Sequence, residues 1–153
     1  MNSLGQLVAI GIISSLAAGG TFLIKGPPLR RLVCDPATLK PDEICLQQIN
    51  LTDKILWVDA RSRTEWKKNG FAGSSLWSLE AGEDMQAFET DIAMKVIETP
   101  RVIVYCGSEA CGLSREVAGR IQNLQLGAEV SVLHGGWRAL SEAGLIKDSN
   151  PGS

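Results

Sequence analysis

The sequence predicts an α/β domain built on a parallel sheet with helices on both faces. Runs of β-prone residues alternate with helical patterns along most of the chain, which is typical of parallel sheets. Several of these runs are continuously apolar, as expected of strands that are buried on both faces. The chain has 153 residues, of which 44% are hydrophobic and 21% are charged. This size and composition suit one globular domain with a core of ordinary size.

A helix and a strand are expected at the start of the domain. Residues 39–49 (LKPDEICLQQI) favour a helix, because Pro41 suits a first helical position. Asp42 and Glu43 would then lie in the first turn, where negative charge is favourable. Residues 54–60 (KILWVDA) are mostly apolar up to an acidic residue and predict a buried strand.

Two helices are expected before residue 100. Ser62 and Glu65 have the spacing of a capping box for a short helix over residues 63–69, which Gly70 would end. A longer helix is expected over residues 83–98, where four apolar side chains recur at helical spacing: Met85, Phe88, Ile92 and Val96. Such a stripe indicates core packing rather than cofactor binding.

The C-terminal part continues the alternation. Pro100 breaks the chain before a strand over residues 102–106 (VIVYC). A helix is expected from residue 112 onward, because four apolar side chains share one helical face: Leu113, Val117, Ile121 and Leu124. Residues 129–133 (EVSVL) favour another strand, and residues 135–144 (GGWRALSEAG) a last short helix.

Residues 4–24 form a stretch of 21 residues without a charged side chain. As a helix, this stretch is long enough to cross a hydrocarbon core of about 30 Å. The first charges, Lys25, Arg30 and Arg31, follow it, and no basic residue precedes it. We therefore expect residues 1–25 to be a single transmembrane anchor. The positive-inside rule then places the globular domain in the cytoplasm.

Two other interpretations of this stretch stay open. A cleaved signal peptide would export the domain, although the basic region that normally begins such a peptide is missing. A buried core helix is the third interpretation, although such helices rarely run this far without a charge. After the hydrophobic segment we expect a linker over residues 26–31, the globular domain over residues 32–147 and a disordered tail over residues 148–153.

Three chemically versatile side chains stand at or just past the ends of predicted strands: Asp59, Cys106 and His134. In open parallel sheets, functional sites gather beyond the carboxyl ends of the strands. Cys106 also precedes a short loop and a helix, whose N-terminal N–H groups and dipole favour an anion. We therefore expect a lowered pKa and a nucleophilic thiolate at Cys106. The loop amides would cradle the sulfur or the substrate, and they belong to Gly107, Ser108, Glu109, Ala110, Cys111 and Gly112. A buried cysteine that only fills the core is the alternative.

Five segments resemble, in this order, the rhodanese-like domain: VDARSRTEW, GFAGS, VIVYC, LSREVAGRI and VLHGGWRAL. The resemblance covers about residues 32–146. It implies a five-stranded parallel sheet and a sulfurtransferase cycle in which Cys106 accepts a sulfane sulfur as a persulfide and gives it to a nucleophile. It also implies that Asp59 and Arg61 are structural, as a buried ion pair or loop anchor. No cofactor is implied, and four cysteines with one histidine are too few and wrongly spaced for a zinc site.

The chain departs from the family pattern at several positions. A histidine and a tryptophan that are common in the family are replaced by Phe71 and Leu140, which look like packing changes. The position after the cysteine is Gly107 instead of a basic residue, and Glu109 adds a negative charge, which should repel thiosulfate. Arg115 is expected to compensate as a substrate-binding residue if it turns towards the loop. A solvated helix residue is the alternative for Arg115.

The remaining cysteines and the histidine permit more than one role. Cys111 could close a disulfide with Cys106 that protects or regulates the site, or it could be a small packing residue. Cys34 and Cys45 are eleven residues apart, and a disulfide between them requires an oxidising compartment. His134 is interpreted as a hydrogen-bonded structural residue, because no third member of a catalytic triad is evident.

Three functions compete at this point. The expected one is a membrane-anchored sulfurtransferase, with a small sulfane-sulfur donor and a thiol or cyanide-like acceptor as partners. A phosphatase or arsenate reductase would need an arginine six residues after the nucleophile, where this chain has Gly112. A non-enzymatic rhodanese-like module that binds a partner or has a regulatory role at the membrane is the remaining alternative. The net charge of −2 gives no basic footprint, so nucleic acid is not an expected partner.

Overall fold

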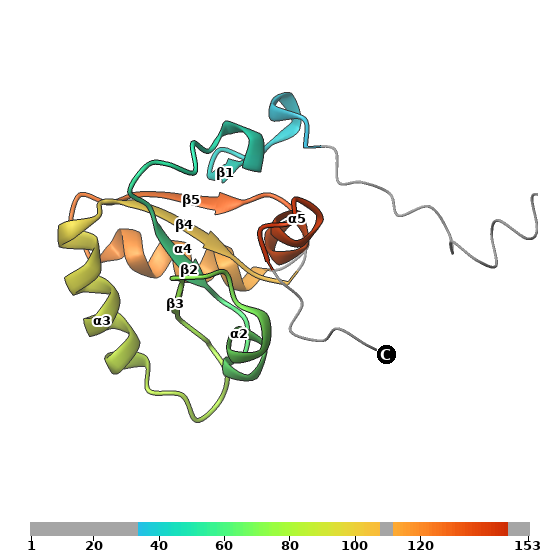
Figure 1. Cartoon of the computed structure of the whole chain (residues 1–153). Coiled ribbons are helices and arrows are strands. Elements are labelled where there is room, and N and C mark those ends of the chain that lie inside the picture. Colours follow the sequence, from blue (N-terminus) through green and yellow to red (C-terminus); the bar gives the residue numbers. More distant parts are fainter. Residues whose placement is uncertain (1–33, 108–111, 147–153) are drawn as a thin grey trace, which may run out of the picture. The chain divides into compact units, whose positions relative to one another are not determined.

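A parallel sheet of five strands forms the centre of the domain in the computed structural model, which describes residues 34–107 and 112–146 (Figure 1). The strands are β1 Glu43–Ile44, β2 Leu56–Asp59, β3 Ser75–Leu76, β4 Arg101–Tyr105 and β5 Glu129–Leu133. The helices are α2 Arg63–Asn69, α3 Met85–Glu98, α4 Gly112–Asn123 and α5 Gly136–Glu142, with short 3-10 helices η1 Pro36–Thr38 and η2 Leu46–Gln48.

The strand order β1-β5-β4-β2-β3 makes β4 the middle strand of the sheet. It pairs in parallel with β2, where Asp59 lies opposite Tyr105, and with β5, where Val104 lies opposite Val132. All the pairings of this sheet are parallel. The carboxyl ends of β2 and β4 therefore meet at one edge of the sheet.

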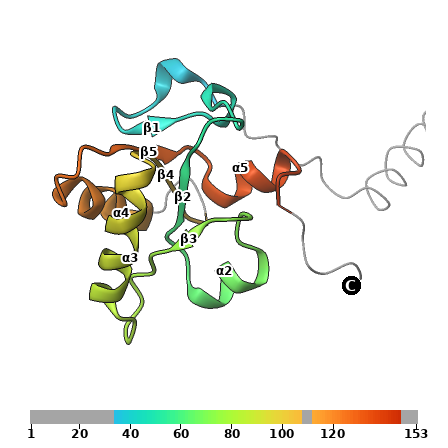
Figure 2. The same ribbon diagram turned by 60° about the vertical axis from the view of Figure 1, so that its left-hand side comes forward.

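Helices cover both faces of the sheet (Figure 2). Alternate side chains of β2 and β4 point to opposite faces, because the side-chain period of a strand is two. One face packs against α3 and α4, and its buried residues include Val58, Val102, Val104, Phe88, Ile92, Val96, Val117 and Ile121. The other face packs against α5, and its buried residues include Trp57, Ile103, Tyr105, Leu133 and Leu140. The predicted α/β class, with a five-stranded parallel sheet and helices on both faces, is confirmed.

Capping residues and apolar periodicity predicted the bounds of two helices to within two residues. Helix α2 occupies residues 63–69 as expected, and the Ser62 hydroxyl accepts from the Glu65 amide while the Glu65 carboxylate accepts from the Ser62 amide. Helix α3 begins at Met85, two residues after the expected start, because the Asp84 side chain accepts from the Ala87 amide as an N-cap.

The helix expected over residues 39–49 is not formed, and this prediction was wrong. Glu43 and Ile44 instead form strand β1, which pairs with β5. The carbonyl oxygen of Asp42 accepts from the Val132 amide at 2.7 Å, and that of Ile44 accepts from the His134 amide at 3.0 Å. These carbonyl groups are therefore used by the sheet and cannot complete a helical turn.

The predicted anchor over residues 1–25, the linker over residues 26–31 and the tail over residues 148–153 lie outside the described residues. Within residues 34–107 and 112–146, no helix has the length and apolar character needed to cross a bilayer.

Candidate active site

Cys106 lies where β4 ends, on the wall of a cavity at the carboxyl edge of the sheet. The residue is only 1% exposed, but a cavity of about 300 Å³ reaches it. The other lining residues come from the end of β2 and the start of α2, from the segment after β3 and from the start of α4: Ala60, Arg61, Ser62, Glu65, Ser78, Leu79, Glu80, Gly107 and Leu113. The structure thus brings three residues of the predicted site together, namely Cys106, Gly107 and Arg61.

Cys106 is oxidised in this structure. It is bonded in a disulfide, and no cysteine of the described part of the chain is a free thiol. Cys34 and Cys45 are bonded to each other in a separate disulfide. The loop residues expected to cradle the sulfur lie outside the described residues: Ser108, Glu109, Ala110 and Cys111. The roles of these residues, and of Cys106 as a nucleophile, stay predictions.

Helix α4 begins at Gly112, at the end of this loop. Leu113, in its first turn, lines the cavity, so the N-terminus of the helix lies at the cavity wall. The partial positive charge of a helix N-terminus favours an anion nearby. The helix that the sequence predicted after the loop is therefore present and begins at the cavity, while its effect on the charge of Cys106 stays a prediction.

The backbone of Cys106 is clamped by the start of helix α5. The carbonyl oxygen of Cys106 accepts from the Trp137 amide at 2.7 Å. Gly136 has a φ of +54°, and a Cβ atom on it would lie 3.1 Å from the carbonyl carbon of Cys106 and closer still to its oxygen. Only glycine allows both this left-handed conformation and this close approach. Gly136 and the backbone amide of Trp137 therefore hold the end of β4 in place.

Asp59 and Arg61 form a buried ion pair behind the cavity. The Arg61 Nη2 atom lies 2.8 Å from Asp59 Oδ2, and both side chains are nearly inaccessible to solvent. The Arg61 Nη1 atom donates to the Asn69 side chain at 3.1 Å, and the guanidinium carbon lies 5.3 Å from the centre of the Trp137 ring. This geometry agrees with the ion pair implied by the family resemblance, and it leaves Arg61 largely neutralised.

Tyr105 connects this ion pair to the strand that carries Cys106. Its hydroxyl group donates to Asp59 Oδ2 at 2.7 Å and accepts from the Phe71 amide at 2.9 Å. Burial and the charge of Asp59 raise the pKa of Tyr105 far above its usual value. The phenol therefore stays protonated and acts as a fixed hydrogen-bond donor.

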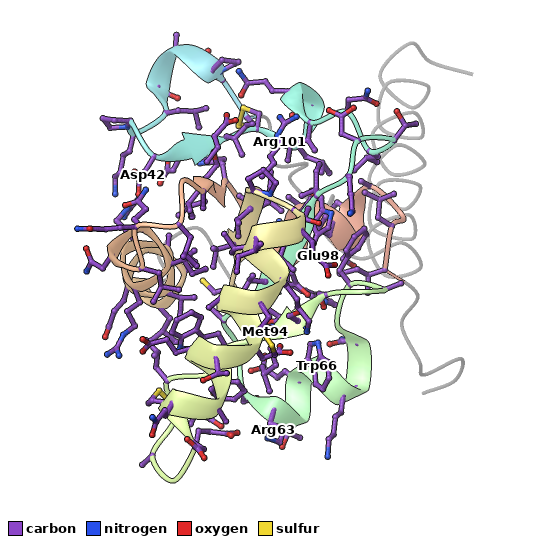
Figure 3. The ribbon with its side chains drawn as sticks, turned by 90° about the vertical axis from the view of Figure 1, so that its left-hand side faces the viewer. Asp42, Arg63, Trp66, Met94, Glu98 and Arg101 are labelled. Carbon is purple, nitrogen blue, oxygen red and sulfur yellow. A yellow bond between two sulfur atoms is a disulfide. The ribbon has the colours of Figure 1, made fainter. Side chains whose placement is uncertain are left out.

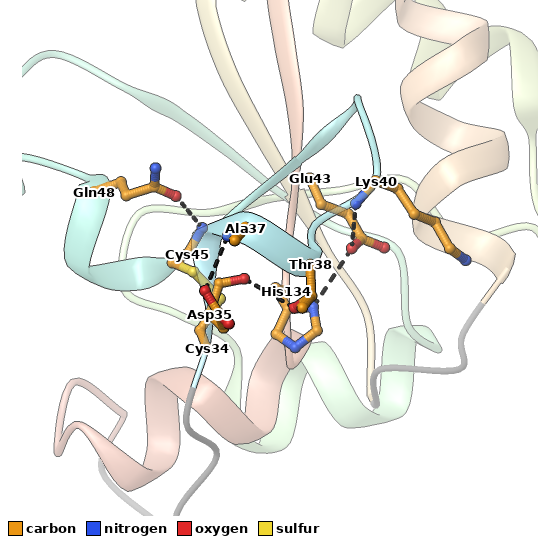
Figure 4. Close-up of a disulfide and its surroundings, with 9 residues drawn as sticks. All are labelled: Cys34, Asp35, Ala37, Thr38, Lys40, Glu43, Cys45, Gln48 and His134. Atoms are coloured by element: carbon orange, nitrogen blue, oxygen red, sulfur yellow. Dashed lines mark hydrogen bonds and ion pairs between the residues drawn. A yellow bond between two sulfur atoms is a disulfide. The ribbon is translucent and has the colours of Figure 1, made fainter.

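Arg115, the predicted substrate-binding cation, contacts strand β1 instead of the cavity. Its Nε atom donates to Asp42 Oδ2 at 2.8 Å, and its Nη2 atom donates to Glu43 Oε1 at 2.5 Å. These bonds raise the pKa of Arg115, first through the bond to Asp42. His134 joins the cluster, with Nδ1 at 3.5 Å from Glu43 Oε2 (Figure 4). The structure therefore does not bring Arg115 to Cys106.

A disulfide joins Cys34 to Cys45, next to this cluster (Figure 4). Cys45 directly follows β1 and is only 1% exposed. Its amide donates to the Gln48 side chain at 2.9 Å. The bond thus attaches the beginning of the described chain to the outer strand of the sheet.

Two features of the site were missed by sequence reasoning. Glu65 and Glu80 line the cavity, whereas the sequence pattern identified Glu65 only as a helix cap and gave no signal for Glu80. The clamp between Gly136 and Cys106 was also missed. Two adjacent glycines before Trp137 are a signal for left-handed backbone, and this signal could have indicated the clamp.

Taken together, the fold and the site define a class: parallel α/β domains with a cysteine at the end of the middle strand, followed by a loop and a helix N-terminus. The chain belongs to the rhodanese-like domain family, whose model matches residues 45–143. Comparison with curated protein sequences finds no match.

Solved structures share the fold at low sequence identity. The N-terminal domain of a Clostridium difficile protein is 18% identical, with a TM-score of 0.50, and the match covers 67% of this chain and 98% of that one. The BH2092 protein of Bacillus halodurans is also 18% identical, with a TM-score of 0.52 and coverage of 70% and 77%. A thiosulfate sulfurtransferase from Pseudomonas aeruginosa is 19% identical with a TM-score of 0.46, and the match covers 70% of this chain and 19% of that one. These likenesses describe the fold and carry no argument about activity.

Proposed function

We propose that this domain is a sulfurtransferase that carries a sulfane sulfur as a persulfide on Cys106. The position of Cys106 is the observation that supports this function best, because the residue borders a cavity at the end of the middle strand. The N-terminus of α4 at the same cavity favours a thiolate. Membership of the rhodanese-like family supports the same chemistry, since that family includes sulfurtransferases.

The proposed cycle begins with reduction, because Cys106 is bonded in a disulfide. A dithiol reductant gives two electrons to that bond, releases the Cys106 thiolate and is itself converted to a disulfide. The thiolate then attacks the outer sulfur of a sulfane donor. The donor's S–S bond breaks, and its electron pair leaves with the remaining part of the donor. An acceptor thiolate finally takes the sulfur from the persulfide and regenerates the Cys106 thiolate.

The surrounding residues would hold the reacting atoms rather than react. The amides of residues 107–112 are proposed to bind the persulfide and the donor. Asp59 and Arg61 support the end of the neighbouring strand through their buried ion pair. Arg115 has no part in the proposal, because Asp42 and Glu43 already match its charge.

Mass spectrometry of the reduced protein after exposure to a sulfane donor tests the proposal. We expect Cys106 to gain the mass of one sulfur atom and to lose it again when cyanide or a thiol is added. Cys106→Ser should gain none. Cys111→Ser is the matched control, because it changes the other cysteine of the segment and keeps the proposed nucleophile, and it should still load.

A non-enzymatic module is the alternative outcome of the same experiment. It is favoured if reduced Cys106 accepts no sulfur from any donor while the domain stays folded. The low exposure of Cys106 and its disulfide are the observations that keep this alternative open.

We further propose that the domain functions in an oxidising compartment, attached to a membrane through residues 4–24. The Cys34–Cys45 bond supports this location, because stable disulfides are rare in reducing compartments. It argues against the cytoplasmic side of the membrane, where the positive-inside rule would place the domain. Alkylation of intact cells with a thiol reagent, followed by digestion without reductant, should recover the two cysteines joined. Recovery of both as alkylated thiols would contradict this location. Membrane fractionation with and without residues 1–31 tests the anchor.

A further inference from the structure

We infer that the cavity beside Cys106 selects sulfur carriers that bear positive charge, and that thiosulfate is a poor donor. This inference rests on the proposed sulfurtransferase function and names its substrate class. It starts from the charges of the residues that line the cavity, which are Arg61, Glu65 and Glu80 among the described ones.

The single cation of this set is already matched. The Arg61 guanidinium lies 2.8 Å from the Asp59 carboxylate, which is fully buried behind the cavity wall. A second, longer contact of 4.0 Å joins Arg61 to Glu65. The positive charge of Arg61 is therefore shared between two carboxylates, and these three groups together have no net positive charge that would attract an anionic substrate.

The two carboxylates at the cavity are exposed to solvent, and hydrogen bonds hold the Glu65 side chain and the Glu80 backbone. Glu65 accepts from the Ser62 hydroxyl at 2.8 Å as part of the cap of α2. Its side chain is 54% exposed, so its charge acts on molecules that enter the cavity. Glu80 is exposed and follows β3, and no ion pair to its carboxylate is formed within the described residues. Its amide donates to the Ser78 hydroxyl at 3.3 Å, which fixes the local backbone.

These charges act on different parts of a substrate. The N-terminus of α4 favours negative charge at the reacting sulfur itself. Glu65 and Glu80 instead act on the group that carries this sulfur. Like charges in a partly enclosed cavity repel, and opposite charges attract, more strongly than in bulk water. A dianion such as thiosulfate is therefore disfavoured, and a hydropersulfide on a cationic group is favoured.

The transfer step is the same for each hydropersulfide donor, written R–S–SH. The Cys106 thiolate attacks the outer sulfur of R–S–SH, a Cys106–S bond forms, and the S–S bond of the donor breaks. The group R–S⁻ leaves with the electron pair, and the proton stays on the transferred sulfur. The donors differ in the charge on R and also in how readily R–S⁻ leaves. The part of the rate difference that added salt or a charge change at the cavity removes is therefore the part that reports the charge of the cavity.

Two hydropersulfides of similar size test the inference. One is formed from cystamine and carries an ammonium group, and the other is formed from the disulfide of 3-mercaptopropionate and carries a carboxylate. Each is generated in the assay by adding sulfide, which splits the disulfide into R–S–SH and R–S⁻. We expect the cationic donor to load reduced Cys106 with a kcat/KM on the order of tenfold higher at low salt. The ratio should shrink as salt is added, because ions screen exposed charges.

Charge variants connect the preference to the cavity. Glu80→Lys should reduce or invert the ratio between the two donors and should improve loading from thiosulfate. Glu98→Lys is the matched control, since it makes the same change in net charge. Glu98 is the last residue of α3. Figure 3 shows it at one end of that helix, whereas Arg63 lies near the other end. Arg63 pairs with Glu83 near the other end of that helix. The control should leave the ratio between the donors unchanged.

The outcomes distinguish failure of the charge selection from failure of the sulfurtransferase function itself. Equal loading by the two hydropersulfides, or faster loading by the anionic one, would overturn the charge selection while leaving the sulfurtransferase intact. A ratio that changes as much in Glu98→Lys as in Glu80→Lys would also overturn it. Failure of every donor to load Cys106 in the folded, reduced protein would remove the proposed function itself, and the inference with it.

Discussion

Replacing Gly136 with alanine is expected to destabilise the domain and to displace Cys106. The φ of +54° at this position costs a residue with a side chain about 1–2 kcal/mol. The added Cβ atom would lie 3.1 Å from the carbonyl carbon of Cys106, whereas carbon atoms pack best at about 3.5–4.0 Å. Overpacking of this kind adds roughly 1–3 kcal/mol. The free energy of unfolding should therefore fall by about 2–5 kcal/mol.

Urea unfolding measures this loss, and Gly144→Ala is the matched control. Gly144 has a φ of +71°, and an added Cβ atom there meets nothing within 4 Å. This variant keeps the conformational cost but lacks the contact, so it should lose only about 1–2 kcal/mol. Gly136→Ala should also change the rate at which reduced Cys106 reacts with a thiol reagent, and Gly144→Ala should not. Equal losses in the two variants would refute the clamp on Cys106.

Two further predictions concern the outer strand β1. Cys34→Ala removes a disulfide that closes a loop of eleven residues, so the free energy of unfolding should fall by about 3 kcal/mol. An unchanged urea midpoint would contradict the presence of this bond in the native protein. Burial raises the pKa of the Glu43 carboxyl, but hydrogen bonds outweigh this effect and hold the pKa below its usual 4.5. Their donors are the Lys40 amide, His134 and Arg115. The stabilisation by the Glu43 carboxylate is thus present above pH 4.5 and is lost on acidification. Between about pH 5 and pH 3, the free energy of unfolding measured in urea should therefore decline less steeply for Glu43→Gln than for the wild type. Parallel declines would rule out this contribution.

Elements with local signals could be predicted from the sequence. The capping box at Ser62 and Glu65 located helix α2 because the interactions that begin a helix span only three residues. The position of Cys106 at the end of a strand also followed from a local apolar run. In both places the local preference and the tertiary structure agree.

Elements that depend on distant partners could not be predicted in this way. Strand β3 has only two residues, and its pairing with β2, rather than any periodicity, defines it. Strand β1 overrides the helix signals at Pro41 because its hydrogen bonds go to β5, far along the chain. The partners of Arg115 are 72 and 73 residues away, so nothing near that residue indicated its direction.

Strand β1 protects one edge of the sheet from pairing with another molecule. With only two residues, β1 is a weak cover for the hydrogen-bonding edge of the five-residue strand β5. The covalent bond from Cys34 and the ion pairs of Arg115 hold this cover in place. An uncovered strand edge is a template for intermolecular pairing. Reducing conditions should therefore promote aggregation of this domain through β5, even where the rest of the sheet remains folded.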